Sequence, residues 1–163
     1  MPTRHARTEI LLSKETVDRL HSYHVLVAGI GGVGGYVAEN LARAGIGKIT
    51  LLDNDTVATS NLNRQLVALE STVGQRKTDI MKSRITDIDP NIQITTIDDF
   101  ISVDTAKNFV TQVPYDYIAD CIDTIACKAQ LVFEAQQASI PIISAMGAGN
   151  LHSSGFVIPV PAT

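Results

Sequence analysis

The chain has 163 residues, of which 45% are hydrophobic and 18% are charged, and its formal net charge is −4. This length and composition predict one compact domain over 1–163, with an N-terminal arm and helix at 1–22 and a core at 23–163. The negative charge argues against a protein that binds nucleic acid over most of its surface. No apolar run is long enough to cross a membrane and 1–9 has no apolar signal core, so we expect a cytoplasmic protein with no membrane partner.

Apolar strands and amphipathic helices alternate along the chain. Helices are predicted at 14–21, 34–45, 75–89, 103–112 and 124–139. Strands are predicted at 24–30, 48–53, 92–98, 116–122 and 141–145, with a last one near 155–160. This alternation favours right-handed crossovers and an α/β, Rossmann-like fold: a mainly parallel sheet with helices on both faces. Pro159 and Pro161 favour an edge position for the last strand.

A glycine-rich turn, GIGGVG at 29–34, joins the first core strand to the next helix. Gly29, Gly31 and Gly34 allow a sharp turn, the approach of a phosphate to the main chain, and close packing of the helix on the strand. The anion would lie on free N–H groups at the start of the helix. The turn is typical of both dinucleotide and mononucleotide sites, and by itself it separates neither from the other.

The segment after the second strand separates these two classes of site. Asp53 lies nineteen residues beyond Gly34, where a carboxylate can accept hydrogen bonds from ribose hydroxyls. A dehydrogenase would continue with a crossover helix, but here a polar loop at 54–63 leads into Arg64 and Gln65. Arginine binds phosphate oxygens through two donors at once, so this loop favours a nucleotide polyphosphate over NAD.

Two further charged residues are candidates for the site: one lies at the start of a predicted helix and the other follows the end of a predicted strand. Lys77 falls with Arg76 in the first turn of the helix at 75–89, where the helix dipole disfavours positive charge and a nearby polyanion would offset the cost. Asp123 follows the strand at 116–122, at the edge of the sheet where α/β proteins bind ligands. With Asp53 or Asp55 it could hold Mg²⁺ through carboxylate oxygens.

Each of these residues also has a purely structural interpretation. Asp123 could be the N-cap of the helix that follows, Arg64 a solvated surface residue, and Asp55 a turn residue. Lys77 could tolerate a dipole cost of about 0.3–1 kcal/mol. The two cysteines have no disulfide or zinc spacing, and we expect Cys127 to pack in the core. The combination of all these residues in order outweighs the structural interpretations.

Taken together, these segments resemble the ThiF/MoeB/ubiquitin-activating superfamily, whose members activate a carboxylate by adenylation. The matching segments are GIGGVGG (29–35), LLDNDTV (51–57), SNLNRQ (60–65), VGQRK (73–77) and DCID (120–123). The resemblance implies that ATP and Mg²⁺ bind, that Asp53 contacts ribose and that Asp123 binds magnesium. The nucleotide contacts that it implies, joined to those reasoned above, are Gly29, Gly31, Gly32, Gly34, Asp53, Asp55, Asn61, Arg64, Gln65 and Lys77.

Arg7, in the segment ARTEILL, is similar to an arginine that members of this superfamily lend to the ATP of a partner subunit. The resemblance therefore implies a homodimer, in which Arg7 acts in trans beside the catalytic candidates Arg64, Lys77 and Asp123. Within the superfamily the chain is most similar to the tRNA threonylcarbamoyladenosine dehydratases. The segments that support this are DTI at 123–125 with Lys128, DDF at 98–100, and SAMGAGN at 144–150.

The chain departs from this subfamily at two places. The segment LHSS at 151–154 replaces a basic residue followed by Asp-Pro, and the chain stops at Thr163 where members of the family continue. We expect that the C-terminal part of the family is not present in this chain. That part normally contributes a crossover loop, further substrate contacts and, in many relatives, a working cysteine.

The preferred hypothesis is an ATP-dependent dehydratase that cyclises threonylcarbamoyladenosine in tRNA through an acyl-adenylate. Its tRNA contacts must be local, and the most basic stretch is the N-terminal arm with Arg4, Arg7, Lys14 and Arg19. One alternative is an adenylyltransferase for the C-terminal glycine of a ubiquitin-like sulfur carrier, with a possible sulfur-transfer partner. Another is a truncated, non-catalytic module that binds nucleotide and dimerises. An NAD-dependent oxidoreductase would leave Arg64 and Lys77 unexplained.

Overall fold

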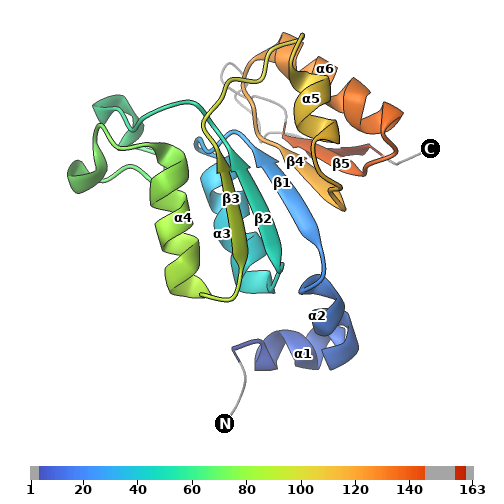
Figure 1. The fold of residues 1–163 in the computed structure, drawn as a ribbon. Coiled ribbons are helices and arrows are strands. Elements are labelled where there is room, and N and C mark those ends of the chain that lie inside the picture. The colour runs from blue at the N-terminus through green and yellow to red at the C-terminus, as the bar shows by residue number, and fades with distance from the viewer. Residues whose placement is uncertain (1–3, 146–156, 161–163) are drawn as a thin grey trace.

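The computed structural model describes residues 4–145 and the backbone of 157–160. Six strands form one sheet in the order β3-β2-β1-β4-β5-β6 (Figure 1). The first five are parallel and β6 is antiparallel to β5, at the edge of the sheet, as the sequence predicts. The strands are β1 His24–Ala28, β2 Lys48–Leu52, β3 Gln93–Ile97, β4 Tyr117–Asp120, β5 Ile142–Ala145 and β6 Val157–Val160. The expected α/β, Rossmann-like fold is confirmed.

Within the described residues, six α-helices and two short 3₁₀ turns accompany the sheet. The helices are α1 Ala6–Leu12, α2 Lys14–Leu20, α3 Gly34–Ala44, α4 Lys77–Ile88, α5 Ala106–Thr111 and α6 Ile125–Gln137; the 3₁₀ turns are η1 Thr59–Asn61 and η2 Glu70–Thr72. The sequence does not predict α1, a seven-residue helix that buries none of its residues, so its apolar side chains do not mark a face directed at the core. Ser13, at φ 71°, separates α1 from α2, and its side chain accepts a hydrogen bond from Thr16 N.

Two strands end earlier than their apolar runs suggest. The sequence predicts strands to 30 and to 122, but β1 ends at Ala28 and β4 at Asp120. Ile30 is nonetheless fully buried, so the hydrophobic pattern continues after the strand has left the sheet. The residues beyond both strand ends instead form loops at the carboxyl edge, where the site lies.

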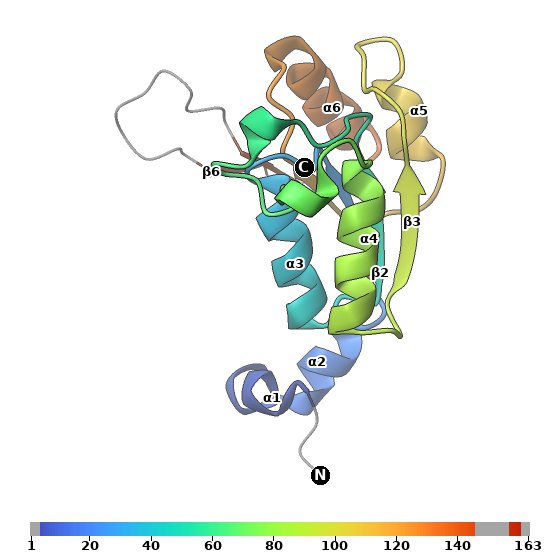
Figure 2. The same cartoon turned by 90° about the vertical axis from the view of Figure 1, so that its left-hand side faces the viewer.

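The central strand is buried on both faces, as parallel sheets require. Val25 and Val27 belong to a hydrophobic core with α3 and α4, whereas Leu26 and Ala28 belong to a second core with α5 and α6. Figures 1 and 2 show the two helix pairs on opposite faces of the sheet and α1 and α2 at the amino end of β1. Among the described residues, no helix combines the length and apolar character that a bilayer crossing demands.

Candidate functional site

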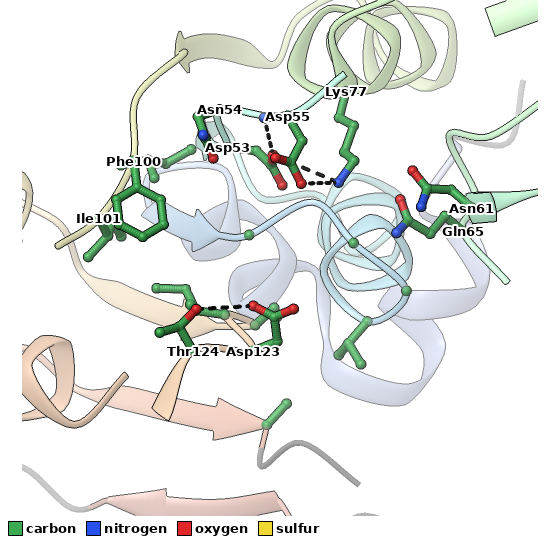
Figure 3. Close-up of a pocket in the computed structure, with 18 of the residues that line it drawn as sticks. Asp53, Asn54, Asp55, Asn61, Gln65, Lys77, Phe100, Ile101, Asp123 and Thr124 are labelled. Carbon is green, nitrogen blue, oxygen red and sulfur yellow. Dashed lines mark hydrogen bonds and ion pairs between the residues drawn. The ribbon is translucent and has the colours of Figure 1, made fainter. Parts of the chain in front are cut away.

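A cavity of about 830 Å³ lies at the carboxyl ends of the strands. It is located where the strand order reverses, because β1 is paired with β2 on one side and β4 on the other, and open α/β sheets bind ligands at this point. Most of the residues predicted for the site line it (Figure 3): Gly29, Gly31, Gly32, Asp53, Asp55, Asn61, Arg64, Gln65, Lys77 and Asp123. Gly34 and Arg7 are the two predicted residues outside this lining.

The glycines of the turn fall into two groups, one required by the fold and one that leaves the main chain open to the cavity. Gly29 has φ +87°, and a Cβ on Gly34 would lie 1.7 Å from the Gly29 carbonyl oxygen, so the fold itself requires both. A Cβ on Gly31 or Gly32 would meet nothing closer than 3.9 Å and 3.7 Å, respectively. The space beside Gly31 and Gly32 is open to the cavity, which leaves their main chain accessible to a ligand.

Asp53 connects the end of β2 to the glycine turn. Its Oδ2 accepts a hydrogen bond from Ile30 N at 2.6 Å and its Oδ1 one from Asp55 N at 2.8 Å, while its side chain is only 8% exposed. Each carboxylate oxygen can accept a second hydrogen bond, so Asp53 can still contact a ribose hydroxyl from its place in the cavity wall. The link to Ile30 N was not predicted from the sequence.

Lys77 is a buried cation at the mouth of the cavity. Its Nζ lies 2.7 Å from Asp55 Oδ2 and 4.0 Å from Asp53 Oδ1. Dashed lines mark these contacts in Figure 3. The helix begins at Lys77, not at 75, and Arg76 instead forms an isolated bridge with Thr56 and pairs with Asp98. The two carboxylates thus offset the unfavourable interaction of Lys77 with the helix dipole. From the sequence alone, a bound polyanion is expected to do so.

Arg64 lies at the rim of the cavity. Its Nη1 donates to Ser60 O at 3.0 Å and to Asn63 Oδ1 at 2.9 Å. Its aliphatic stem packs beside Gly32, at 3.7 Å from the position that a Cβ there would occupy. Because one Nη atom makes both contacts, the other guanidinium donors can turn to a phosphate.

Gln65 and Asn61 face the cavity from the same loop. Gln65 is only 7% exposed, and its Oε1 has no hydrogen-bond partner among the described residues. Buried acceptors are nearly always paired, so this oxygen indicates a donor supplied by a ligand or by water. Asn61 Oδ1 accepts a hydrogen bond from Ala58 N at 3.0 Å, which fixes its side chain.

Asp123 is an exposed carboxylate on the other side of the cavity from Lys77 and Asp55 (Figure 3). It lies three residues beyond β4, not at the end of the strand, and the N-cap position of α6 is occupied by Thr124. The N-cap interpretation of Asp123 is therefore wrong. Thr124 Oγ1 contacts its Oδ1 at 3.5 Å, so the carboxylate remains available.

Asp123 is also more available to a cation than Asp53 or Asp55. Both oxygens of Asp53 accept hydrogen bonds from main-chain N–H groups, and Asp55 pairs with Lys77. Within residues 4–145, no group of three or more His, Cys, Asp or Glu side chains forms a metal cage. A single carboxylate with phosphate oxygens and water is nevertheless a usual set of ligands for magnesium.

A buried polar cluster under the cavity was not predicted as a site. Asp120 Oδ2 lies 2.7 Å from Lys128 Nζ and 2.5 Å from Ser144 Oγ, and Asp120 Oδ1 accepts a hydrogen bond from Ile122 N at 3.1 Å. Asp120, Lys128 and Ser144 are all at most 4% exposed. The cluster fixes the loop that bears Asp123. Its signal in the sequence is a lysine in the apolar stripe of α6, eight residues after an aspartate that ends a strand.

The two cysteines are free and form no disulfide. Cys121 lies one residue beyond β4, in the cavity wall, and not within the strand as the sequence suggests. Burial, with a smaller effect from the charge of Asp120, raises the pKa of the Cys121 thiol to about 12. Cys127 is buried in α6 among core residues, which confirms its packing role.

Arg7 does not join the cavity of its own chain. It is exposed on α1, at the amino end of the sheet, whereas the cavity is at the carboxyl end (Figure 1). The exposed side chains of Ile10 and Leu11, at 87% and 82%, lie on the same helix.

Comparison with known proteins places this geometry in a family. The sequence profile of the ThiF family matches residues 3–161. The tRNA threonylcarbamoyladenosine dehydratase of Bacillus subtilis (strain 168) is 45% identical over 145 residues, which are 89% of this chain and 57% of that protein. The molybdopterin-synthase adenylyltransferase of Escherichia coli (strain K12) is 37% identical over 127 residues, covering 78% of this chain and 50% of that protein.

Solved structures agree with the sequence relatives. The crystal structure of E. coli tRNA N6-threonylcarbamoyladenosine dehydratase, TcdA, in complex with ATP superimposes with a TM-score of 0.87 at 39% identity, covering 92% of this chain and 61% of that one. The chain thus spans between half and two thirds of the length of these relatives. With its profile match over nearly all residues and its glycine turn, polar loop and cavity in the expected places, the chain belongs to the ThiF family.

Proposed function

We propose that this chain binds ATP at the carboxyl edge of the sheet and forms the adenylating part of an enzyme that activates a carboxylate. The observation that supports this most strongly is the set of groups around one cavity: the open main chain of Gly31 and Gly32, the cations Lys77 and Arg64, and the unpartnered Oε1 of Gln65. A volume of about 830 Å³ also suits a nucleotide.

We propose threonylcarbamoyladenosine in tRNA as the substrate of the whole protein, and its cyclising dehydration, in the cytoplasm, as the activity. The support is the 45% identity to the B. subtilis dehydratase, against 37% for the E. coli adenylyltransferase. The match to the E. coli dehydratase with ATP bound supports the same nucleotide.

In the first step the substrate carboxylate attacks the α-phosphorus of ATP, and pyrophosphate leaves. The main-chain N–H groups beside Gly31 and Gly32 would bind the phosphates, and Lys77 and Arg64 would offset the charge that develops on the transferring and leaving groups. In the second step the carbamoyl group of the same substrate attacks the acyl carbon, closes a ring and releases AMP. This step is intramolecular, so correct positioning supplies much of its rate.

Asp123 would hold a magnesium ion, because it is an exposed carboxylate of the cavity that forms no ion pair with a described residue and matches the magnesium-binding position of the family motif. Bound there with the phosphate oxygens, magnesium would neutralise negative charge on the triphosphate. The protein's own part is to fix the loop of Asp123 through the Asp120–Lys128 pair below it.

We also propose that the protein is a homodimer in which Arg7 reaches the ATP of the partner. Arg7 is too far from its own cavity, and the exposed Ile10 and Leu11 on α1 provide an apolar face for the contact. Mixing inactive Arg7→Ala protein with inactive Lys77→Met protein would restore activity through mixed dimers that have one complete site. Unchanged inactivity after subunit exchange would contradict the role in trans.

Mass spectrometry of tRNA nucleosides tests the main proposal. Full-length protein, ATP and Mg²⁺ should convert threonylcarbamoyladenosine in tRNA to a product lighter by one water, with one AMP released per product. Isothermal titration on the same protein should show binding of ATP and none of NADH. If the nucleoside stays unchanged while ATP binds, the dehydratase assignment is wrong but the nucleotide site stands.

The 37% identity to the molybdopterin-synthase adenylyltransferase supports a second candidate, activation of the C-terminal glycine of a ubiquitin-like sulfur carrier, with a sulfur-transfer partner. This candidate predicts ATP–pyrophosphate exchange that depends on a protein ending in Gly-Gly and ignores tRNA. A third candidate, a nucleotide-binding dimerisation module, predicts ATP binding and no AMP with either substrate.

A further inference from the structure

A second cavity, of about 530 Å³, lies at the opposite end of the sheet from the nucleotide cavity. Its wall combines the N-terminal arm, the end of α2, the start of β2 and the connection from α4 to β3. The polar and charged side chains in this wall include Arg4, His5, His21, Lys48, Asp89 and Asn91. None of them belongs to the site described above.

His5 is the unusual residue in this wall. It is only 6% exposed, yet neither Nδ1 nor Nε2 has a hydrogen-bond partner among the described residues. The ring of His21 packs against it edge-on, with 5.2 Å between centroids. Both rings pack against Gly45, because a Cβ there would lie 3.1 Å from His21 Nε2 and 3.3 Å from His5 Nε2. A buried imidazole with two unpartnered nitrogens indicates a missing ligand atom.

The charges around the cavity favour an anion. Among the described residues, Asp89 is the only acidic side chain in the wall, and this carboxylate already pairs with Arg4 at 2.7 Å and accepts hydrogen bonds from Asn91 N and Nδ2. Lys48 is exposed and forms no ion pair with any described residue. Arg4 uses only Nη1 in its contacts with Asp89 and Ile88 O, so its other donors are available.

We propose that this cavity is a binding site for a phosphate group. Lys48 and Arg4 supply positive charge, and His5 supplies an N–H donor once the exposed ring of His21 rotates aside. Two sources share this chemistry: a phosphodiester of an RNA backbone and a free phosphate ion. The RNA source rests on the proposed function and agrees with the net charge of −4, because a protein of that charge must hold RNA through local contacts. The phosphate chemistry itself does not depend on that function.

Salt-dependent tRNA binding tests the RNA source. Fluorescence anisotropy with a labelled tRNA transcript is measured on the full-length protein between low and physiological salt. For Lys48→Ala the slope of log affinity against log salt should fall by about 1, with a loss of affinity of about three-fold or more at low salt. Lys107→Ala is the matched control, because it removes the same charge from an exposed position on α5, outside both cavities, where the side chain also forms no ion pair with any described residue. It should leave the slope unchanged.

Inorganic phosphate tests the second source. Phosphate should raise the melting temperature of the wild type more than chloride of equal ionic strength, and His5→Phe, which keeps a ring but removes both nitrogens, should abolish the difference. A change in the salt dependence of tRNA binding in Lys48→Ala assigns the site to RNA. A change confined to the phosphate-dependent melting temperature assigns it to the free phosphate ion. If neither effect depends on Lys48 or His5, the proposal is overturned. ATP binding, measured on the same variants, should stay at the wild-type value, and its failure in the wild type would reject the proposed function and not this site.

Discussion

Lys77 and Asp55 form an ion pair across the mouth of the nucleotide cavity, with 2.7 Å between Nζ and Oδ2. The partners differ in environment, since the Lys77 side chain is 5% exposed and that of Asp55 is 60% exposed. A buried ammonium at the start of α4 is therefore paired with a solvent-exposed carboxylate. An entering triphosphate can displace this carboxylate without leaving Lys77 uncompensated.

Lys77→Met should weaken ATP binding by about ten-fold or more, because hydrogen bonds to charged groups contribute about 1.5–3 kcal/mol. Isothermal titration in the presence of Mg²⁺ measures the change. Lys82→Met, which removes the same charge from the exposed face of the same helix, is the control and should bind ATP like the wild type. Equal affinities for the two variants would contradict the assignment of Lys77 to the triphosphate.

Gly31→Ala should impair ATP binding, whereas Gly34→Ala should impair folding. Gly31→Ala should fold, because its Cβ would meet nothing closer than 3.9 Å, but its methyl group would enter the phosphate space and reduce ATP affinity. Gly34→Ala places a Cβ 1.7 Å from a main-chain oxygen and should destabilise the protein by about 3 kcal/mol or more. Urea unfolding and ATP titration separate the two. Normal ATP affinity of a folded Gly31→Ala protein would show that no ligand approaches this main chain.

Asp123→Asn should remove the effect of magnesium on ATP binding. In the wild type, Mg²⁺ should tighten ATP binding, whereas in the variant the affinity should be the same with Mg²⁺ and with a chelator. Asp99→Asn changes another carboxylate in the cavity wall, one that accepts a hydrogen bond from its neighbour Phe100 N, and should retain the magnesium effect. A retained effect in Asp123→Asn would remove Asp123 from the metal site.

Lys128→Met should destabilise the protein by about 3–5 kcal/mol, because it leaves the fully buried carboxylate of Asp120 without its counterion. Replacing both partners, as Asp120→Asn with Lys128→Met, should recover most of this loss. The free energy of unfolding in urea at neutral pH measures both variants. A Lys128→Met protein as stable as the wild type would show that the pair does not hold the loop.

Cys121 should resist alkylation although it lines the cavity. Its thiol, with a pKa of about 12, stays protonated at pH 8, and the thiolate is the reactive form. Iodoacetamide should therefore label Cys121 in the native protein about a thousand-fold more slowly than in urea, as expected from the pKa shift relative to an ordinary cysteine. Mass spectrometry after timed quenching gives the rate at each cysteine. Rapid native labelling of Cys121 would contradict a protonated, buried thiol.

The sequence predicts the sheet and the composition of the nucleotide cavity because both depend on local patterns. The apolar runs and the glycine turn are contiguous, and the residues after each parallel strand necessarily meet at one edge of the sheet. Strand ends are less predictable, since Ile30 is buried after β1 has ended. Helix α1 is only seven residues long and has no buried face, so its exposed Ile10 and Leu11 do not follow a core-facing pattern.

Long-range polar contacts are the part that the sequence does not specify. Asp120, Lys128 and Ser144 come from three separate elements, and their pairing depends on the order of strands β4 and β5 and the depth of α6. The link from Asp53 to Ile30 N and the pairing of Lys77 with Asp55 likewise join residues more than twenty positions apart. Residue type indicates that such groups need partners, and only the packed structure indicates which.

The reversal of strand order between β1 and β4 has a consequence for how the protein tolerates sequence change. A nucleotide at this reversal touches loops anchored in both hydrophobic cores, so its binding energy adds to the stability of the whole fold, by about 2.7 kcal/mol at a concentration of 100 times Kd. Substitutions that weaken either core would then cause no detectable unfolding while the nucleotide concentration is high. They would cause unfolding only when the nucleotide concentration falls.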